Sequence, residues 1–172
     1  SSVSAAKPKI ADYPFTTLVP NLGVVDLGPS TRFVIADIPG LIEGAAEGAG
    51  LGHRFLAHVE RCKALLHLID ATQDHPEESY RMIRGELEAY AEHLADKPEV
   101  VALTKADALL DEQLDEAKAA LEAECGKPVH VISSVAGRNV KPVLRQLAKH
   151  VTGEDIEEDD APLSEDSEGW AP

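Results

Sequence analysis

The stretch that decides the predicted fold is Val100-Val101-Ala102-Leu103-Thr104-Lys105-Ala106-Asp107, in which four apolar residues lead into a polar tetrad. The apolar part is short and continuous, which is typical of a strand buried on both faces of a parallel sheet. Two further runs share this character, Ala64-Leu65-Leu66-His67-Leu68-Ile69 and Val129-His130-Val131-Ile132. Together the three runs predict a mostly parallel sheet, whose ligand is expected at the carboxyl ends of its strands.

Helical patterns separate these runs. Apolar residues recur every three or four positions, which places them on one face of a helix. The three periodic sets are Tyr80, Ile83, Leu87, Tyr90 and Leu94; Leu114, Ala117, Leu121 and Cys125; and Val140, Leu144, Leu147 and Val151. Pro76 suits a first helical turn, Gly126 and Gly153 suit helix ends, and a shorter helix is expected over residues 51–61.

A hairpin is predicted ahead of the first helix. Residues 22–27 and 32–36 are apolar runs that flank Gly28-Pro29-Ser30, a turn sequence. The resulting order of hairpin, helix and alternating strands and helices predicts an α/β, three-layer sandwich.

Composition describes a soluble globular chain of 172 residues, 44% apolar and 27% charged. It contains no run of 18 apolar residues, so no transmembrane helix is expected, and its first residues do not resemble a signal peptide. Two cysteines, Cys62 and Cys125, are too few for a disulfide framework and fit a reducing, cytoplasmic setting.

The net charge of −15 is unevenly distributed. Residues 153–172 hold nine of the 31 acids and none of the 16 bases, so the rest of the chain carries −6. We therefore expect a domain over residues 1–151 and an acidic, disordered tail over 152–172, with a partner-binding tail as the alternative. An acidic body disfavours binding to free DNA, because nucleic-acid phosphates need Lys and Arg.

Polar elements follow the predicted strands in a consistent order. Asp37-Ile38-Pro39-Gly40 follows the second strand of the hairpin, residues 104–107 follow the fourth strand, and Ser133-Ser134-Val135-Ala136-Gly137 follows the fifth. A loop bounded by prolines, residues 12–20, precedes the first. Each element alone could be a turn or a helix cap, but the ordered set of four points to one ligand site.

The ordered set resembles a small GTPase domain of the TRAFAC class. Residues 7–18, then Pro20-Asn21-Leu22-Gly23, then residues 37–45 closely resemble the Obg family, ribosome-associated GTPases of the bacterial cytoplasm and of organelles. The YchF and Drg branches share several of these motifs. The resemblance covers residues 1 to about 151 and implies a P-loop NTPase fold, GTP hydrolysis with Mg²⁺, and a large-ribosomal-subunit partner. A monomer without a membrane partner is expected.

The resemblance also implies roles for individual residues. Thr17 would bind Mg²⁺, Asp37 would hold an Mg²⁺-bound water, and the Gly40 N–H would face the γ-phosphate. Asp107 would accept hydrogen bonds from guanine, and Lys105 would lie along the base. The full nucleotide-binding set is Phe15, Thr16, Thr17, Leu18, Val19, Asp37, Ile38, Pro39, Gly40, Thr104, Lys105, Ala106, Asp107, Ser133, Ser134 and Val135.

Three departures from the family pattern qualify this expectation. No stretch matches the phosphate-binding loop G-x-x-x-x-G-K-[ST], so we expect an N-terminally incomplete GTPase domain that also lacks its first strand and binds GTP poorly. Thr104 stands where Asn is usual. Leu41 stands where Ras-like proteins carry the Gln that orients water, so hydrolysis is expected to be slow; Gly40 and Leu41 flank the attacking-water position and no catalytic residue is assigned.

Two rival interpretations remain open at the level of sequence. The chain could be a nucleotide-independent interaction module that acts through its tail and sheet surface, or an α/β domain with another base preference. His58 and Cys62, four residues apart on a helix, could share a metal ion, but two ligands are too few for a zinc site.

Overall fold

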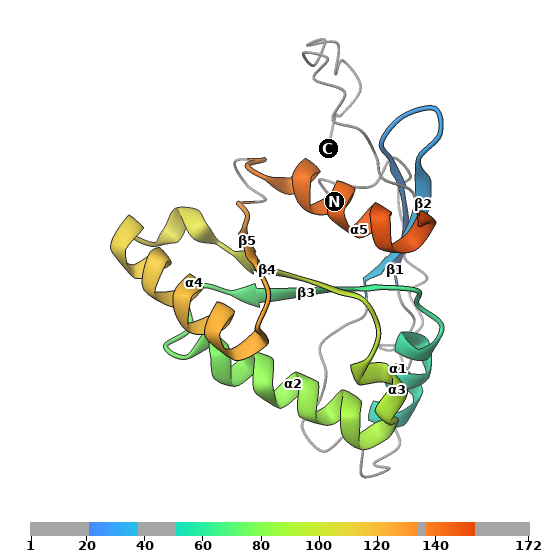
Figure 1. Cartoon of the computed structure of the whole chain (residues 1–172), viewed down its shortest axis with the longest axis horizontal. Coiled ribbons are helices and arrows are strands. Elements are labelled where there is room, and N and C mark those ends of the chain that lie inside the picture. Colours follow the sequence, from blue (N-terminus) through green and yellow to red (C-terminus); the bar gives the residue numbers. More distant parts are fainter. Residues whose placement is uncertain (1–20, 38–50, 134–136, 154–172) are drawn as a thin grey trace.

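The computed structural model describes residues 21–37, 51–133 and 137–153, with side chains described from residue 56 onward in the second range. Residues 1–20, 38–50, 134–136 and 154–172 lie outside this description. The described elements form two sheets and the helices that pack on them (Figure 1).

The larger sheet is parallel and confirms the three strands predicted from the apolar runs. Its order is β3 (Leu65–Asp70), β4 (Glu99–Thr104) and β5 (Val129–Val131), so β4 is central. The five residues from Glu99 to Leu103 are all buried, as a strand covered on both faces requires. Because the strands are parallel, the ends of β3, β4 and β5 meet at one edge of the sheet, the carboxyl edge.

Helices cover both faces of this sheet, which confirms the three-layer arrangement (Figure 1). Alternate residues of β4 point to opposite sides: Val100 and Ala102 pack with α5 (Val140–Thr152), whereas Val101 and Leu103 pack with the layer of α2 (Pro76–Tyr90) and α4 (Asp111–Cys125). The helix ends also follow the sequence, since left-handed glycines at φ 66° and 74° terminate α4 and α5 at Gly126 and Gly153.

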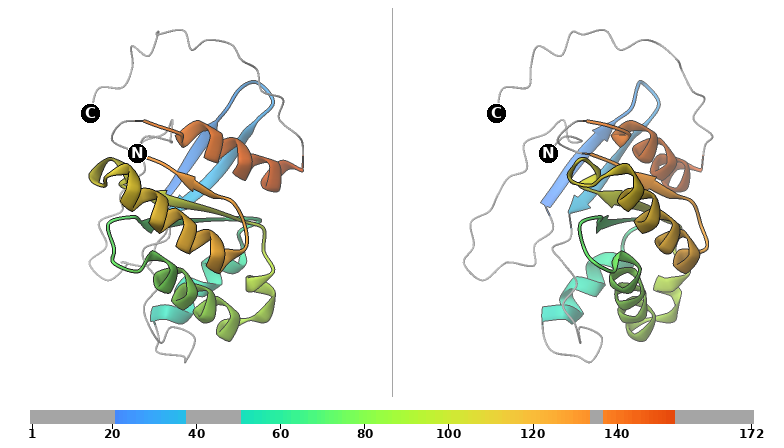
Figure 2. Two further views of the ribbon diagram at one scale, coloured as in Figure 1. Left: turned by 60° about the vertical axis from the view of Figure 1, so that its left-hand side comes forward. Right: turned by 90° about the vertical axis from the view of Figure 1, so that its left-hand side faces the viewer.

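The predicted hairpin is present, as a separate antiparallel sheet of β1 (Asn21–Asp26) and β2 (Arg32–Asp37). It lies beside α5 in both views of Figure 2. Val25 and Phe33 face each other across the hairpin and join the same apolar cluster as α5. Among the described strands, no hydrogen-bonded ladder joins the hairpin to the parallel sheet.

One predicted helix is divided in two. The periodic set from Tyr80 to Leu94 predicts a single helix, but α2 stops at Tyr90 and a short helix, α3 (Glu92–Ala95), follows. Ala91 between them has an extended backbone, with φ −160° and ψ 122°. The chain changes direction at this break, but Leu94 is still fully buried. It packs with Leu87 and with Leu56 and Val59 of α1 (Leu51–Glu60), so the periodic apolar residues on both sides of the break join one cluster.

A buried carboxylate organises the opposite, amino edge of the sheet. Glu99 starts β4, and its side chain is only 1% exposed. It accepts hydrogen bonds from His67 Nδ1 (3.1 Å), Tyr80 Oη (3.0 Å) and Lys127 Nζ (3.1 Å), and Arg84 Nη1 lies 3.6 Å from Glu99 Oε1. Burial alone would raise the pKa of Glu99, but the hydrogen bond from His67 and the charge of Arg84 outweigh it and hold the pKa at about 2.

Candidate functional site

Polar side chains converge at the carboxyl edge of the parallel sheet. Asp70 ends β3, Thr104 ends β4 and is followed by Lys105 and Asp107, and Ser133 follows β5. Sheet pairing sets their relative positions, because Asp70 pairs with Thr104 in the β3–β4 register. The edge predicted to carry the ligand site is therefore the edge at which these residues gather.

The first pair at this edge is Lys105 with Asp70. Lys105 Nζ lies 2.6 Å from Asp70 Oδ2. The other carboxylate oxygen accepts both the backbone N–H of Thr72 at 2.9 Å and its hydroxyl at 2.6 Å. The hydrogen bond from Lys105, followed by those from Thr72, lowers the pKa of Asp70 to about 2, so the carboxylate is ionised at neutral pH.

The backbone at Lys105 has an unusual conformation. Its φ of 58° lies in the left-handed region, where a residue with a Cβ is uncommon. A short 3₁₀ helix, η2 (Ala106–Ala108), follows at once. Just before it, the Thr104 hydroxyl donates to the Ile69 carbonyl oxygen at 3.2 Å, so this side chain ties the ends of β3 and β4 together.

The second pair joins Asp107 to Ser133. The Ser133 hydroxyl donates to Asp107 Oδ1 at 2.6 Å, across 26 residues of sequence. This hydrogen bond lowers the pKa of the Asp107 carboxyl below its usual range. Ser133 is 2% exposed, whereas Asp107 is exposed, so a buried donor orients a carboxylate that remains open to solvent.

The backbone of Ser133 is also engaged. Its N–H donates to the Arg138 carbonyl oxygen at 3.3 Å, and the Arg138 N–H returns a hydrogen bond of 3.0 Å. The Ser133 N–H is therefore engaged within the chain, by the segment that leads into α5. The structure adds the hydroxyl contact with Asp107, which the sequence analysis did not anticipate.

The remaining expected site residues lie elsewhere. Asp37 is exposed at the end of β2, in the hairpin sheet. Its carboxylate belongs to the hard oxygen ligands that Mg²⁺ takes, and a carboxylate can also accept hydrogen bonds from Mg²⁺-bound water. Outside the described residues lie Phe15, Thr16, Thr17, Leu18, Val19, Ile38, Pro39, Gly40, Leu41, Ser134 and Val135.

Asp70 and Thr72 were missed by the sequence analysis. The sequence did hold an indication, because Asp70 stands at the end of a predicted apolar strand, as Thr104 and Ser133 do. An Asp that accepts hydrogen bonds from the residue two positions later forms a common local turn. The contact with Lys105, 35 residues away, needed the strand register and could not be read from local pattern.

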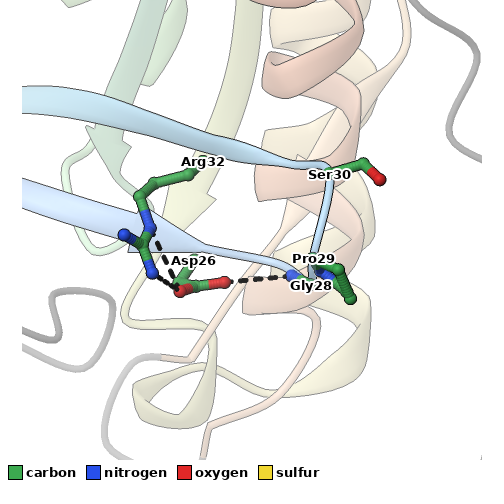
Figure 3. A pocket seen from close by; sticks show the side chains of 5 residues that line it. All are labelled: Asp26, Gly28, Pro29, Ser30 and Arg32. Carbon is green, nitrogen blue, oxygen red and sulfur yellow. Dashed lines mark hydrogen bonds and ion pairs between the residues drawn. The ribbon is translucent and has the colours of Figure 1, made fainter.

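Other candidate sites are weaker. Within the part of the chain that the structure describes, no group of three or more His, Cys, Asp or Glu side chains could hold a metal ion. The Cys62 thiol instead lies 3.4 Å from the His58 carbonyl oxygen. A hollow at the hairpin turn is lined by Asp26, Gly28, Pro29, Ser30 and Arg32, and the Asp26–Arg32 ion pair occupies its wall (Figure 3).

A second hollow lies between the loop after β3 and helix α4, next to Asp70. Thr72, Asp74 and Glu77 line one side, and Gln113 and Glu116 line the other. Ala71, Leu109, Ala117 and Ala120 also line it, so the hollow combines polar and apolar side chains. None of the helices in the described ranges is both long and apolar enough to cross a membrane.

Comparison with known proteins identifies the family. The family model described as "50S ribosome-binding GTPase" matches residues 1–105. Because this match spans more than half of the 172 residues, the chain belongs to that GTPase family. The family match includes Thr104 and Lys105 but ends before Asp107 and Ser133, so their contact is an observation of the structure alone.

Two solved structures share the fold. A point variant of Aquifex aeolicus Era bound to GDP·AlF4⁻ superposes with a TM-score of 0.60 at 21% identity, covering 86% of this chain and 48% of Era. A probable GTP-binding protein engB gives 0.54 at 16% identity, covering 89% and 90% of the two chains. The chain thus spans about half the length of the Era structure it matches. These likenesses establish a P-loop GTPase type of α/β fold.

Proposed function

We propose that this chain belongs to the guanine-nucleotide-binding domain of an Obg-type GTPase. The complete protein hydrolyses GTP to GDP with Mg²⁺ and acts in the cytoplasm as a ribosome-linked switch, whereas this chain, which has no match to the phosphate-binding loop, binds GTP poorly on its own. The observation that carries the proposal is the contact between Asp107 and Ser133 at the carboxyl edge. Membership of the GTPase family supports the reaction, and the description of that family as ribosome-binding supports a ribosomal partner. The Obg branch rests on the motifs in residues 7–45.

Asp107 is suited to reading guanine. A carboxylate can accept two hydrogen bonds, one from the ring N1–H and one from the exocyclic amine of guanine. Adenine presents no such pair of donors, so an adenine in the same place would leave the carboxylate unsatisfied, at a cost of roughly 1–3 kcal/mol. The carboxylate interacts with the Ser133 hydroxyl, through Oδ1, and with the N–H of Asp107 itself. Because a carboxylate has about four lone-pair sites, Asp107 retains acceptor capacity for the base.

The phosphate end of the nucleotide would be served by residues 15–19 and 37–40. Thr17 and Asp37 would hold Mg²⁺, directly and through a bound water, and the ion would neutralise charge on the β- and γ-phosphates. Asp37 is exposed at the end of its strand, which is compatible with this role. Gly40, without a Cβ, would allow its N–H to approach the γ-phosphate closely.

Nucleotide titration tests the proposal directly. Fluorescent GDP, GTP and ATP are titrated in Mg²⁺ against this chain and against the complete gene product. Preferential binding of guanine nucleotides by the complete protein supports the proposal. A folded complete protein that binds none of them refutes it, and the interaction-module interpretation would then take its place.

Substitution of Asp107 gives the sharper test. In Asp107→Asn the side-chain amide donates where the carboxylate accepted, which matches the carbonyl at position 2 of xanthine instead of the amine of guanine. We expect GDP affinity to fall by tenfold or more and xanthosine diphosphate affinity to rise, measured by competition. Equal loss of both nucleotides would show that Asp107 supports the fold rather than reads the base.

A further inference from the structure

We propose that Asp70 is a positioning residue for the nucleotide: its fixed carboxylate holds the Lys105 side chain in place at the carboxyl edge before the base arrives. This inference rests on the proposed function and assigns to that site a residue outside the expected nucleotide-binding set. Asp70 acts through Lys105 and makes no direct contact with the base.

The carboxylate of Asp70 is held on both oxygens. Oδ1 accepts the N–H and the hydroxyl of Thr72, and Oδ2 lies 2.6 Å from Lys105 Nζ. Thr72 therefore selects one orientation of the Asp70 side chain, and that orientation presents Oδ2 to Lys105. A carboxylate with all these donors stays ionised, consistent with its lowered pKa.

The backbone holds the two partners at a set distance. Asp70 pairs with Thr104 across the sheet, the Ala71 N–H donates to the Thr104 carbonyl oxygen at 3.0 Å, and the Thr104 hydroxyl donates to Ile69. Lys105 follows directly with φ 58°, a conformation that is uncommon for a residue with a side chain. Sheet register and local backbone together place the Lys105 ammonium over Asp70.

This arrangement differs from an incidental surface ion pair. Exposed pairs usually contribute little because two long side chains must be ordered for a weak attraction. Here the carboxylate belongs to a short side chain already fixed by Thr72, so only Lys105 is ordered. Lys105 is 64% exposed and would otherwise sample many rotamers, and that ordering cost would then fall on nucleotide binding.

Asp70 should affect the affinity for the nucleotide but not the preference between bases. Lys105 is expected to lie along the base with its aliphatic stem, whereas Asp107 reads the edge of the base. Loss of Asp70 should therefore weaken binding of GDP and IDP, which lacks the amine that Asp107 would read, by the same factor. The ratio of the two affinities should not change, because Asp107 and Ser133 keep their contact.

The test compares Asp70→Asn with Asp26→Asn in the complete gene product. In Asp70→Asn the amide oxygen could still accept the Thr72 hydrogen bonds, but the charge that holds Lys105 would be lost. Asp26 is a matched control at the hairpin turn: one oxygen accepts the Gly28 N–H at 3.1 Å and the other is 2.6 Å from Arg32 (Figure 3). We expect Asp70→Asn to raise the Kd of GDP and of IDP about tenfold each, and Asp26→Asn to change neither.

A double-mutant cycle shows whether Asp70 acts through Lys105. If it does, Asp70→Asn adds little once Lys105→Ala is present, and Thr72→Ala weakens GDP binding where Thr72→Ser does not. Unchanged GDP binding by Asp70→Asn, a changed ratio of GDP to IDP, or additive effects in the cycle would each overturn the inference. If the unsubstituted protein itself binds no guanine nucleotide, the proposed function is refuted, and this outcome is distinct from a failure of the inference about Asp70.

Discussion

Among the residues that the structure describes, Glu99 is the one buried residue with a side chain that is charged at neutral pH. Its carboxylate is almost fully buried, and side chains from β3, α2 and the segment just before β5 surround it. A buried charge is tolerated only when opposite charges and hydrogen bonds replace the lost water. The network thus joins three parts of the fold at the amino edge, away from the residues proposed to bind nucleotide.

Replacing Glu99 by Gln should destabilise the domain substantially. The Arg84 and Lys127 cations would remain near a neutral amide, and removing one partner of a buried ion pair typically costs about 3 kcal/mol. Denaturant titration measures the free energy of unfolding. The control is Glu124→Gln, which breaks a more exposed pair with Arg81 and should cost less than about 1 kcal/mol. Equal effects of the two substitutions would contradict this account.

Glu99 should also make the stability of the domain depend on pH in the acid range. The pKa of Glu99 is lowered to about 2 in the folded protein from an ordinary 4.5, so the unfolded chain takes up the proton first as the pH falls. The stability that Glu99 contributes is therefore complete above about pH 4.5 and is lost as the pH falls toward 2. We expect the free energy of unfolding to decline over this range, and to decline less steeply in Glu99→Gln. Parallel pH profiles for the two proteins would refute the assignment.

At the scale of the element, glycine stabilises a helix end but destabilises a helix interior. Gly126 ends α4 with φ 66°, a conformation that disfavours a Cβ. Gly85 lies inside α2, where an added Cβ would meet nothing within 4 Å. The same substitution therefore has opposite expected effects at two positions that are both open to solvent.

Thermal unfolding of two alanine variants measures this difference. Gly126→Ala should destabilise by about 1 kcal/mol because alanine is strained in the left-handed conformation. Gly85→Ala should stabilise by roughly 0.5–1 kcal/mol because alanine restricts the unfolded chain and favours the helix. A shift of melting temperature in the same direction for both variants would show that packing, and not backbone conformation, controls these positions.

At the scale of the molecule, the proposed ligand should stabilise the fold. A ligand that binds only the folded state at 100 times its Kd contributes about 2.7 kcal/mol. We expect GDP with Mg²⁺ to raise the melting temperature of the complete gene product, and ATP to leave it unchanged. In Asp107→Asn the rise should follow xanthosine diphosphate instead. A rise with GDP that survives this substitution would place the nucleotide elsewhere.

The elements and the class of fold were accessible from local pattern. Continuous apolar runs predicted β3, β4 and β5, and the turn at residues 28–30 predicted the hairpin. Gly126 and Gly153 predicted helix ends. These predictions succeeded because burial and backbone conformation restrict which residue types occur at a position. The position of the polar residues at one edge followed from the parallel strands. The break at Ala91 could not be predicted from local pattern, because the apolar spacing continues across it.

The pairing of side chains depended on the folded chain. Asp70 with Lys105, Ser133 with Asp107, and Glu99 with His67 are contacts between residues 26 to 35 positions apart. Contacts over such separations cannot be predicted from local pattern, because they form only when strand register and helix packing bring distant segments together. Residue types thus established which chemistry the carboxyl edge could offer, and three-dimensional packing established which donor meets which carboxylate.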